Sequence, residues 1–164
     1  MSSKIDTLRQ MAAAIGETQI AYHKFFPQFA DQLTQELGQF LGDPGAVALC
    51  PANGEFSFDV QYRHEGLGFE KGRYRVPVMI RLKNLKDDGD LLIRIKLTFV
   101  KGEKALLAWI GDEKAVTFEH GKLDVLLEAV YEHLTDLLSS SAWFEENPSQ
   151  YQGTKIGFST ASVA

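Results

Sequence analysis

Residues 73–83 and 92–99 constrain the fold most, because apolar side chains recur at every second position in both runs. Between them lies the segment 86–90, whose Asp88-Gly89 pair is typical of a tight hairpin turn. Successive side chains of a strand point to opposite faces, so the apolar sets of both runs can cover one side of a sheet. We therefore predict a long antiparallel hairpin with one apolar face.

The alternate positions of this hairpin are rich in basic side chains, which the same rule places together on the second face. The predicted basic sheet face consists of Arg73, Arg75, Arg81, Lys83, Arg94 and Lys96. Arginine on a rigid strand suits recognition of carboxylates or phosphates, because its planar guanidinium can bond two oxygens at once. An ordinary solvated face is the alternative interpretation.

Charge is distributed unevenly along the chain. The formal net charge is −5, yet residues 72–101 are net positive. Non-specific affinity for nucleic acid depends on the number of phosphates neutralised, so a net-acidic chain is a poor general nucleic-acid binder. A local basic face instead predicts a single anionic partner, such as an acidic protein segment.

Two helical segments are predicted before the sheet, over 4–15 and 17–41. In the first, apolar residues recur at helical spacing between a Ser3 cap and Gly16. These residues are Ile5, Leu8, Met11, Ala12 and Ile15. Pro27 cannot donate a helical hydrogen bond, so we expect a kink or a restart there.

Strand-like alternation and turn residues follow. Strands are predicted near 46–50, 55–63, 73–84, 91–100, 104–110 and 114–119. Short connections leave no room for crossover helices, so the sheet should be antiparallel. A helix over 122–141 has a continuous apolar stripe that belongs on the sheet.

Together these elements predict a single α+β domain over 1–164. An N-terminal helical segment (1–42) and a long C-terminal helix (122–141) would pack on one face of a twisted antiparallel sheet (46–119) of five or six strands. The tail, 143–164, is polar, and its composition fits either a short strand near 155–158 or a loose end.

No catalytic residue, metal ligand or cofactor site is predicted, and a non-enzymatic protein is favoured. The four histidines are dispersed and are expected at the surface, without the spacing of a zinc site. Cys50 has no local helix N-terminus or cationic neighbour to lower its pKa, so we expect a small buried residue.

The leading functional hypothesis is a cytoplasmic binding or adaptor module of a regulatory, chaperone-like or immunity type. It would recognise an acidic protein or another anionic partner through the basic sheet face. The lone cysteine fits a reducing compartment, and neither a secretory signal nor an apolar run of about 20 residues is present, so no membrane association is expected.

The alternative hypothesis is a small apolar-ligand-binding protein, or an enzyme, with a pocket between the sheet and the C-terminal helix. Side chains expected to line such a pocket are Phe29, Tyr74, Phe99, Trp109, Val130 and Leu134. Close packing of these residues in the core is the competing interpretation.

Self-association is also expected, as a two-fold homodimer. The outer face of the C-terminal helix carries an acidic strip of Asp124, Glu128, Glu132 and Asp136, which should point away from the basic face of the same molecule. Two molecules could bring the faces together, with apolar burial from Trp143, Phe144 and the tail.

Overall fold

The computed structural model describes residues 3–83, 89–111, 115–139 and, for its backbone, 154–159. Its longest element is helix α1 (Lys4–Leu41), which has 38 residues. Ser3 caps its first turn, and Gly42, with φ of +85°, ends it in the left-handed conformation that glycine adopts without strain. A short 3-10 turn, η1 (Pro44–Ala46), leads into the sheet.

The prediction of two N-terminal helices is wrong, because α1 continues through both Gly16 and Pro27. An interior glycine costs about 1 kcal/mol relative to alanine but does not end a helix unless the chain also turns there. Pro27 removes one hydrogen bond, yet the buried residues Phe26 and Phe29 on either side of it fix the helix against the sheet. Tertiary packing therefore overrides both local signals.

The sheet has seven described strands, and every pairing between them is antiparallel. They are β1 (Val47–Leu49), β2 (Gly68–Glu70), β3 (Arg73–Leu82), β4 (Asp90–Lys101), β5 (Ala105–Ile110), β6 (Val116–Glu119) and β7 (Thr154–Ser159). The main path runs β1-β3-β4-β5-β6, while β2 pairs with β3 and β7 pairs with β4. Short strands β2 and β7 thus extend the pairing of the central hairpin.

The predicted hairpin is confirmed as β3 and β4, which pair from Tyr74 opposite Phe99 to Leu82 opposite Leu91. Its apolar side chains of one parity are buried, as the alternation predicted. Leu82 is the exception, because the strand ends there and the side chain is 37% exposed.

The strand predicted over 55–63 is absent, and the described backbone from 51 to 67 forms turns and irregular loop. Two of its carbonyl groups accept hydrogen bonds from arginine side chains of the sheet rather than from the backbone of a neighbouring strand. The carbonyl oxygens of Gly54 and Gly66 accept hydrogen bonds from Arg94 and Arg75 respectively. This connection, here called the 51–67 loop, packs against the second face of the sheet.

Helix α2 (Asp124–Ser139) agrees with the predicted C-terminal helix. Its buried side chains join those of α1 and of the apolar sheet face in one core cluster. Both helices therefore lie on the same side of the sheet, and the predicted α+β class is confirmed.

Aromatic rings fill the core between α1 and the sheet. Phe26 stacks on Tyr74 with ring centroids 4.4 Å apart, and Phe29 meets Phe99 edge to face at 5.1 Å. Such pairs add about 0.5–1.5 kcal/mol beyond the burial of their area. Phe26 and Phe29, on either side of Pro27, therefore belong to the core.

Candidate functional site

The basic sheet face is largely engaged in contacts within the molecule. Arg75 donates from Nε to the carbonyl oxygen of Gly66 at 2.8 Å, and its Nη1 lies 3.9 Å from Glu70. Lys96 pairs with the same carboxylate, with Nζ 3.0 Å from Oε2. Glu70, on β2, thus offsets part of the charge that the alternation pattern placed on this face.

Arg94 is the most deeply buried of the six, at 9% exposed. Its Nη1 donates to the carbonyl oxygen of Gly54 at 2.7 Å, and its guanidinium lies 5.0 Å from the Phe56 ring centre. A buried cation is costly unless it is hydrogen-bonded, so these contacts tie the 51–67 loop to β4. In the structure Arg94 has an architectural role.

Arg73 and Arg81 are also engaged. The Arg73 guanidinium lies 3.6 Å from the centre of the Trp109 ring, a close cation–π contact on the second face of the sheet. Arg81 donates from Nε to Asp90 at 2.6 Å. Lys83 differs, because it follows the end of β3 and is exposed. Recognition of an acidic partner through all six residues therefore stays a prediction.

A cavity of about 390 Å³ lies between the end of α1, the end of β3 and helix α2. It is lined by Leu41, Asp43, Ala46, Arg81, Leu82, Lys83, Tyr131, Leu134, Thr135 and Leu138. Of the six side chains expected to line a pocket, the structure places Leu134 here. Phe29, Tyr74, Phe99 and Val130 are buried in the core, and Trp109 lies under Arg73.

His133 and Cys50 are the two buried residues among the histidines and the cysteine. His133, expected at the surface, is only 2% exposed because it lies on the buried side of α2. Cys50 is buried as predicted, and burial raises the pKa of its thiol to about 12. Across the described residues no group of three or more histidine, cysteine or carboxylate side chains is arranged to hold a metal ion.

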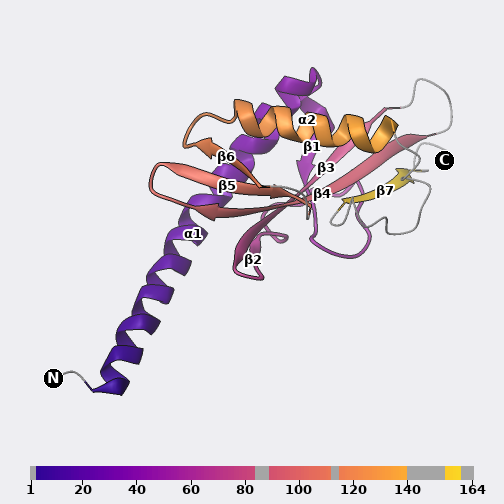
Figure 1. Cartoon of the computed structure of the whole chain (residues 1–164). Helices are drawn as coiled ribbons and strands as arrows, with labels where there is room; N and C mark the ends of the chain where they lie inside the picture. The colour runs from indigo at the N-terminus through magenta and orange to yellow at the C-terminus, as the bar shows by residue number, and fades with distance from the viewer. Residues whose placement is uncertain (1–2, 84–88, 112–114, 140–153, 160–164) are drawn as a thin grey trace.

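The most unusual surface belongs to the first half of α1. From residue 4 to 21 every residue except Asp6 and Gly16 is exposed, and this projecting segment extends beyond the sheet (Figure 1). Over about 18 residues at 1.5 Å each, its length is about 27 Å. The prediction that the whole N-terminal region packs on the sheet is thus wrong for this segment.

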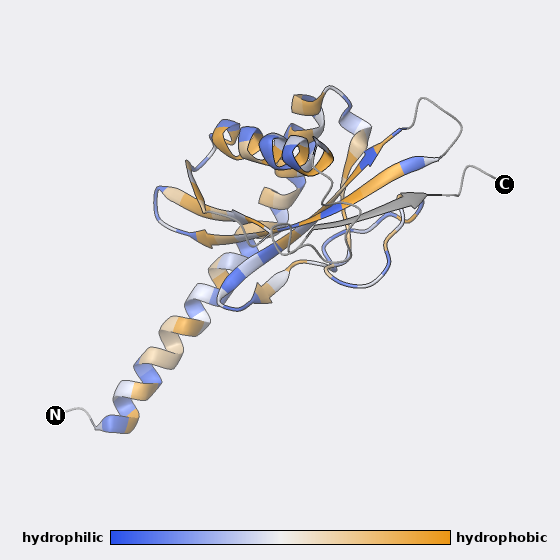
Figure 2. Ribbon diagram, turned by 45° about the vertical axis from the view of Figure 1, so that its right-hand side comes forward, coloured by the Kyte–Doolittle hydropathy of each residue, from blue (hydrophilic) through white to orange (hydrophobic). Residues whose placement is uncertain are grey.

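The projecting segment carries an apolar stripe along one side. Ile5 is 53% exposed, Leu8 and Met11 are each 59% exposed, and Ile15 is 61% exposed. With Ala12 these residues form the projecting stripe. At 3.6 residues per turn, the stripe lies on the same side of α1 as Tyr22, Phe26, Phe29, Leu33 and Leu37, which are buried against the sheet. The polar residues Thr18 and Gln19 interrupt it between Ile15 and Tyr22. Figure 2 shows hydrophobic and hydrophilic residues alternating along this part of the helix.

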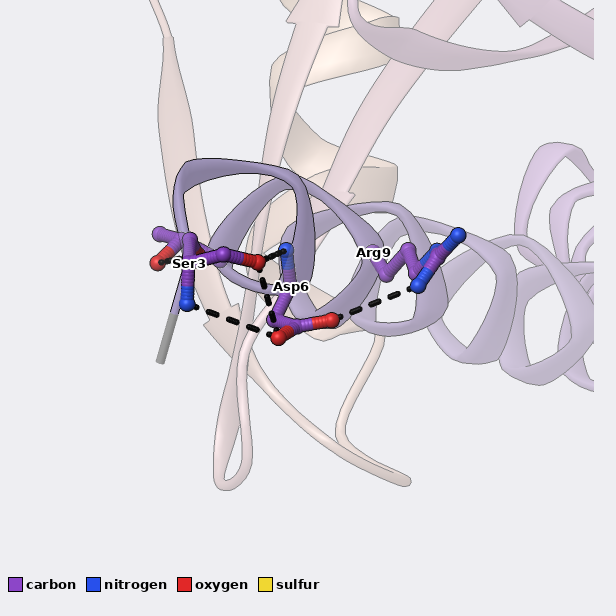
Figure 3. A network of polar contacts seen from close by, with 4 residues as sticks. Ser3, Asp6 and Arg9 are labelled. Atoms are coloured by element: carbon purple, nitrogen blue, oxygen red, sulfur yellow. Dashed lines mark hydrogen bonds and ion pairs between the residues drawn. The ribbon is translucent and has the colours of Figure 1, made fainter. Parts of the chain in front are cut away.

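Local interactions cap the projecting segment. The Ser3 hydroxyl accepts a hydrogen bond from the Asp6 backbone N–H at 3.2 Å, and the Asp6 carboxylate accepts one from the Ser3 hydroxyl at 2.8 Å (Figure 3). Arg9 donates to the other oxygen of that carboxylate at 3.3 Å. This capping box, with a negative charge in the first turn, favours the helix start without any tertiary contact.

Tyr22 marks the boundary between the projecting and the packed halves of α1. Its hydroxyl meets the backbone of Lys101, the last residue of β4, and its ring stacks on Phe69 at 5.4 Å. Sequence reasoning missed this boundary because the spacing of apolar residues reports a stripe but not how far the sheet beneath it reaches. Continuity of the stripe across Gly16 was the available signal that a single helix is present.

Comparison of the chain with models of known protein families, with curated proteins and with solved structures finds no match. Among the described residues, no helix combines the length and the hydropathy that a membrane span requires.

Proposed function

We propose that this chain is a non-enzymatic protein-binding module of the cytoplasm, and that the projecting stripe of α1 is its docking element. The observation that carries the proposal is that apolar residues on one side of α1, interrupted at Thr18 and Gln19, extend over both halves of the helix. Its second half is covered by the sheet, whereas Ile5, Leu8 and Ile15 in its first half are each more than half exposed. Contiguous exposed apolar side chains of this kind mark interaction sites in soluble proteins.

Energetics support a docking role. Full burial of one leucine or isoleucine side chain contributes about 1.5–3 kcal/mol, so covering the stripe would supply substantial affinity. An isolated helix of this length is marginal in water. Here the packed half of α1 and the Ser3 cap hold both ends, so the stripe is presented in a pre-formed helix. A partner then loses little free energy to ordering the binding surface.

Site-specific photo-crosslinking tests this proposal. A photoreactive phenylalanine analogue replaces Leu8 on the stripe, or Ile20, which is 57% exposed but about 120° around the helix from the midline of the stripe. We expect a protein adduct from position 8 in cells and little from position 20. Equal adducts from both positions, or none from position 8, would contradict a docking role for the stripe.

A second candidate function, binding of a small amphipathic acid, is supported by the cavity beside α2. Its volume of about 390 Å³ lies within the range of ligand pockets, and four of its ten lining residues are leucines. Lys83 is exposed at the same cavity and supplies a cation for a carboxylate head group. This candidate combines the predicted anionic partner with the predicted apolar ligand.

Titration with a medium-chain fatty acid such as decanoate, followed by calorimetry, tests the second candidate. Leu138→Trp should fill the cavity and abolish binding, and Lys83→Gln should weaken it. Val125→Trp is the matched control, because Val125 is exposed on α2 but does not line the cavity. Absence of heat at millimolar decanoate, or equal binding by both tryptophan variants, would rule this candidate out.

A further inference from the structure

We infer that the partner of the projecting stripe is a second copy of this chain, bound so that the two α1 helices run antiparallel. This inference rests on the proposed docking role of the stripe and adds the identity and orientation of the occupant. It differs from the dimer expected from sequence, which joined the basic sheet face to the acidic strip of α2.

The direction of the stripe fixes the orientation. Because the stripe lies on the same side of α1 as its buried residues, it points to the side on which the sheet lies. In a parallel pair joined through this stripe, both folded bodies would compete for the space next to the same end of the helix pair. In an antiparallel pair each body lies at an opposite end, beyond the N-terminus of the other helix. Only the antiparallel arrangement lets two stripes meet without a collision.

The length of the projecting segment fits such a pair. Antiparallel helices that overlap over residues 5–22 place Ile5 of one copy beside Tyr22 of the other, and Ala12 beside Ile15. Phe69 stacks on Tyr22 at the edge of the sheet and is 36% exposed. It offers an apolar surface on which the first turn of the second helix ends.

Charge favours a second copy over a strongly charged partner. The segment 4–21 has two basic residues, Lys4 and Arg9, and two acidic residues, Asp6 and Glu17, so two such segments meet without net repulsion. The chain as a whole carries −5, and the antiparallel arrangement keeps the two net-acidic bodies at opposite ends.

Sedimentation equilibrium of the purified full chain tests association. We expect twice the chain mass of 18.3 kDa at micromolar concentration. The double variant Leu8→Glu/Ile15→Glu should weaken dimerisation at least about tenfold, whereas Ile20→Glu should not. Helical circular dichroism checks that all variants remain folded. The dimer should persist in about 1 M salt, which screens surface ion pairs and would dissociate a dimer held by the basic face and the acidic strip.

A thiol-reactive crosslink tests orientation. In the antiparallel pair the two copies of position 12 lie close to the two-fold axis, while the two copies of position 5 are about 26 Å apart. A short bismaleimide should therefore link Ala12→Cys to itself but not Ile5→Cys, and buried Cys50 should contribute little. Efficient linking at position 5 would overturn the antiparallel arrangement.

The two proposals fail in distinguishable ways. A monomer at all concentrations, combined with a photo-adduct at position 8 to a different protein, would overturn the second copy as the partner and leave the docking role intact. A monomer without any adduct at position 8 would overturn both proposals.

Discussion

The Tyr22 hydroxyl and the backbone of Lys101 exchange two hydrogen bonds where α1 leaves the sheet. The hydroxyl accepts from the Lys101 N–H at 2.8 Å and donates to the carbonyl oxygen of the same residue at 3.4 Å. One side chain thereby ties the helix to the end of β4. On one side of it the apolar stripe is core, and on the other side it is surface.

Replacing Tyr22 by phenylalanine should therefore destabilise the fold without affecting the projecting stripe. We expect a loss of about 0.5–1.5 kcal/mol in the free energy of unfolding, the usual net contribution of an intramolecular hydrogen bond. The ring contacts with Phe26 and Phe69 are retained in this variant. Urea titration measures the change, and an unaltered unfolding midpoint would show that this link contributes nothing.

Gly66 should not tolerate a side chain. A Cβ atom there would overlap the carbonyl oxygen of Cys50 and lie 2.6 Å from Cγ of Pro77. The backbone of the 51–67 loop must therefore shift away from β3, and overpacking of this kind costs about 1–3 kcal/mol. We expect Gly66→Ala to lower the melting temperature clearly.

Gly45→Ala provides the matched control for this prediction. A Cβ atom at Gly45 would have Asp43 Oδ1 as its nearest neighbour at 3.7 Å, an ordinary contact. Equal melting temperatures for the two variants would mean that the loop does not pack as closely on β3 as the structure indicates.

The sequence predicted the β3–β4 hairpin and its core face because alternation reports directly which side chains share a face. Tyr74 and Phe99 are therefore paired across the hairpin as expected. The same rule gathered the basic residues but could not tell how they are covered. Arg94 and Arg75 donate to carbonyl groups of the 51–67 loop, of which only residues 55–63 were predicted to form a strand. Such contacts with a loop produce no periodic pattern in the sequence.

The extent of the sheet under α1 was equally hidden. Whether an apolar stripe is core or surface depends on where its covering strands end, which is a property of the tertiary structure. A local signal gave a wrong boundary at Gly16. This glycine was predicted to end a helix, but α1 continues through it. Of the six side chains predicted to line a pocket, Leu134 lines the cavity. Four of the others are buried in the core instead.

Arg94 should hold the 51–67 loop on the sheet. Arg94→Met retains an apolar side chain of similar length but removes the hydrogen bond to the carbonyl oxygen of Gly54. That carbonyl group is then left without its side-chain donor. We expect a loss of about 1–3 kcal/mol in stability, and faster cleavage within the loop by a protease of broad specificity. Lys96→Met serves as the control, because Lys96 pairs with Glu70 outside the loop. Equal cleavage of both variants would contradict this role of Arg94.

The pH dependence of stability should report the burial of Cys50. Burial raises the pKa of this thiol from 9.0 to about 12, with a smaller opposing effect of the Arg94 charge. A raised pKa for a thiol means that the folded state favours the neutral form, so its contribution is fully present below pH 9 and is lost as pH rises toward 12. Above pH 9 the unfolded chain releases this proton first, and stability falls by about 1.4 kcal/mol per pH unit from this group.

Comparison with Cys50→Ala isolates that contribution from other groups that titrate in alkali, including Tyr74, whose pKa burial also raises. The advantage in unfolding free energy of the native chain over the variant should be constant from pH 7 to 8.5 and shrink steadily from pH 9 to 10.5. Urea titrations at each pH measure this difference. A difference that stays constant across the whole range would mean that the Cys50 thiol has an ordinary pKa and is reached by water in the folded state.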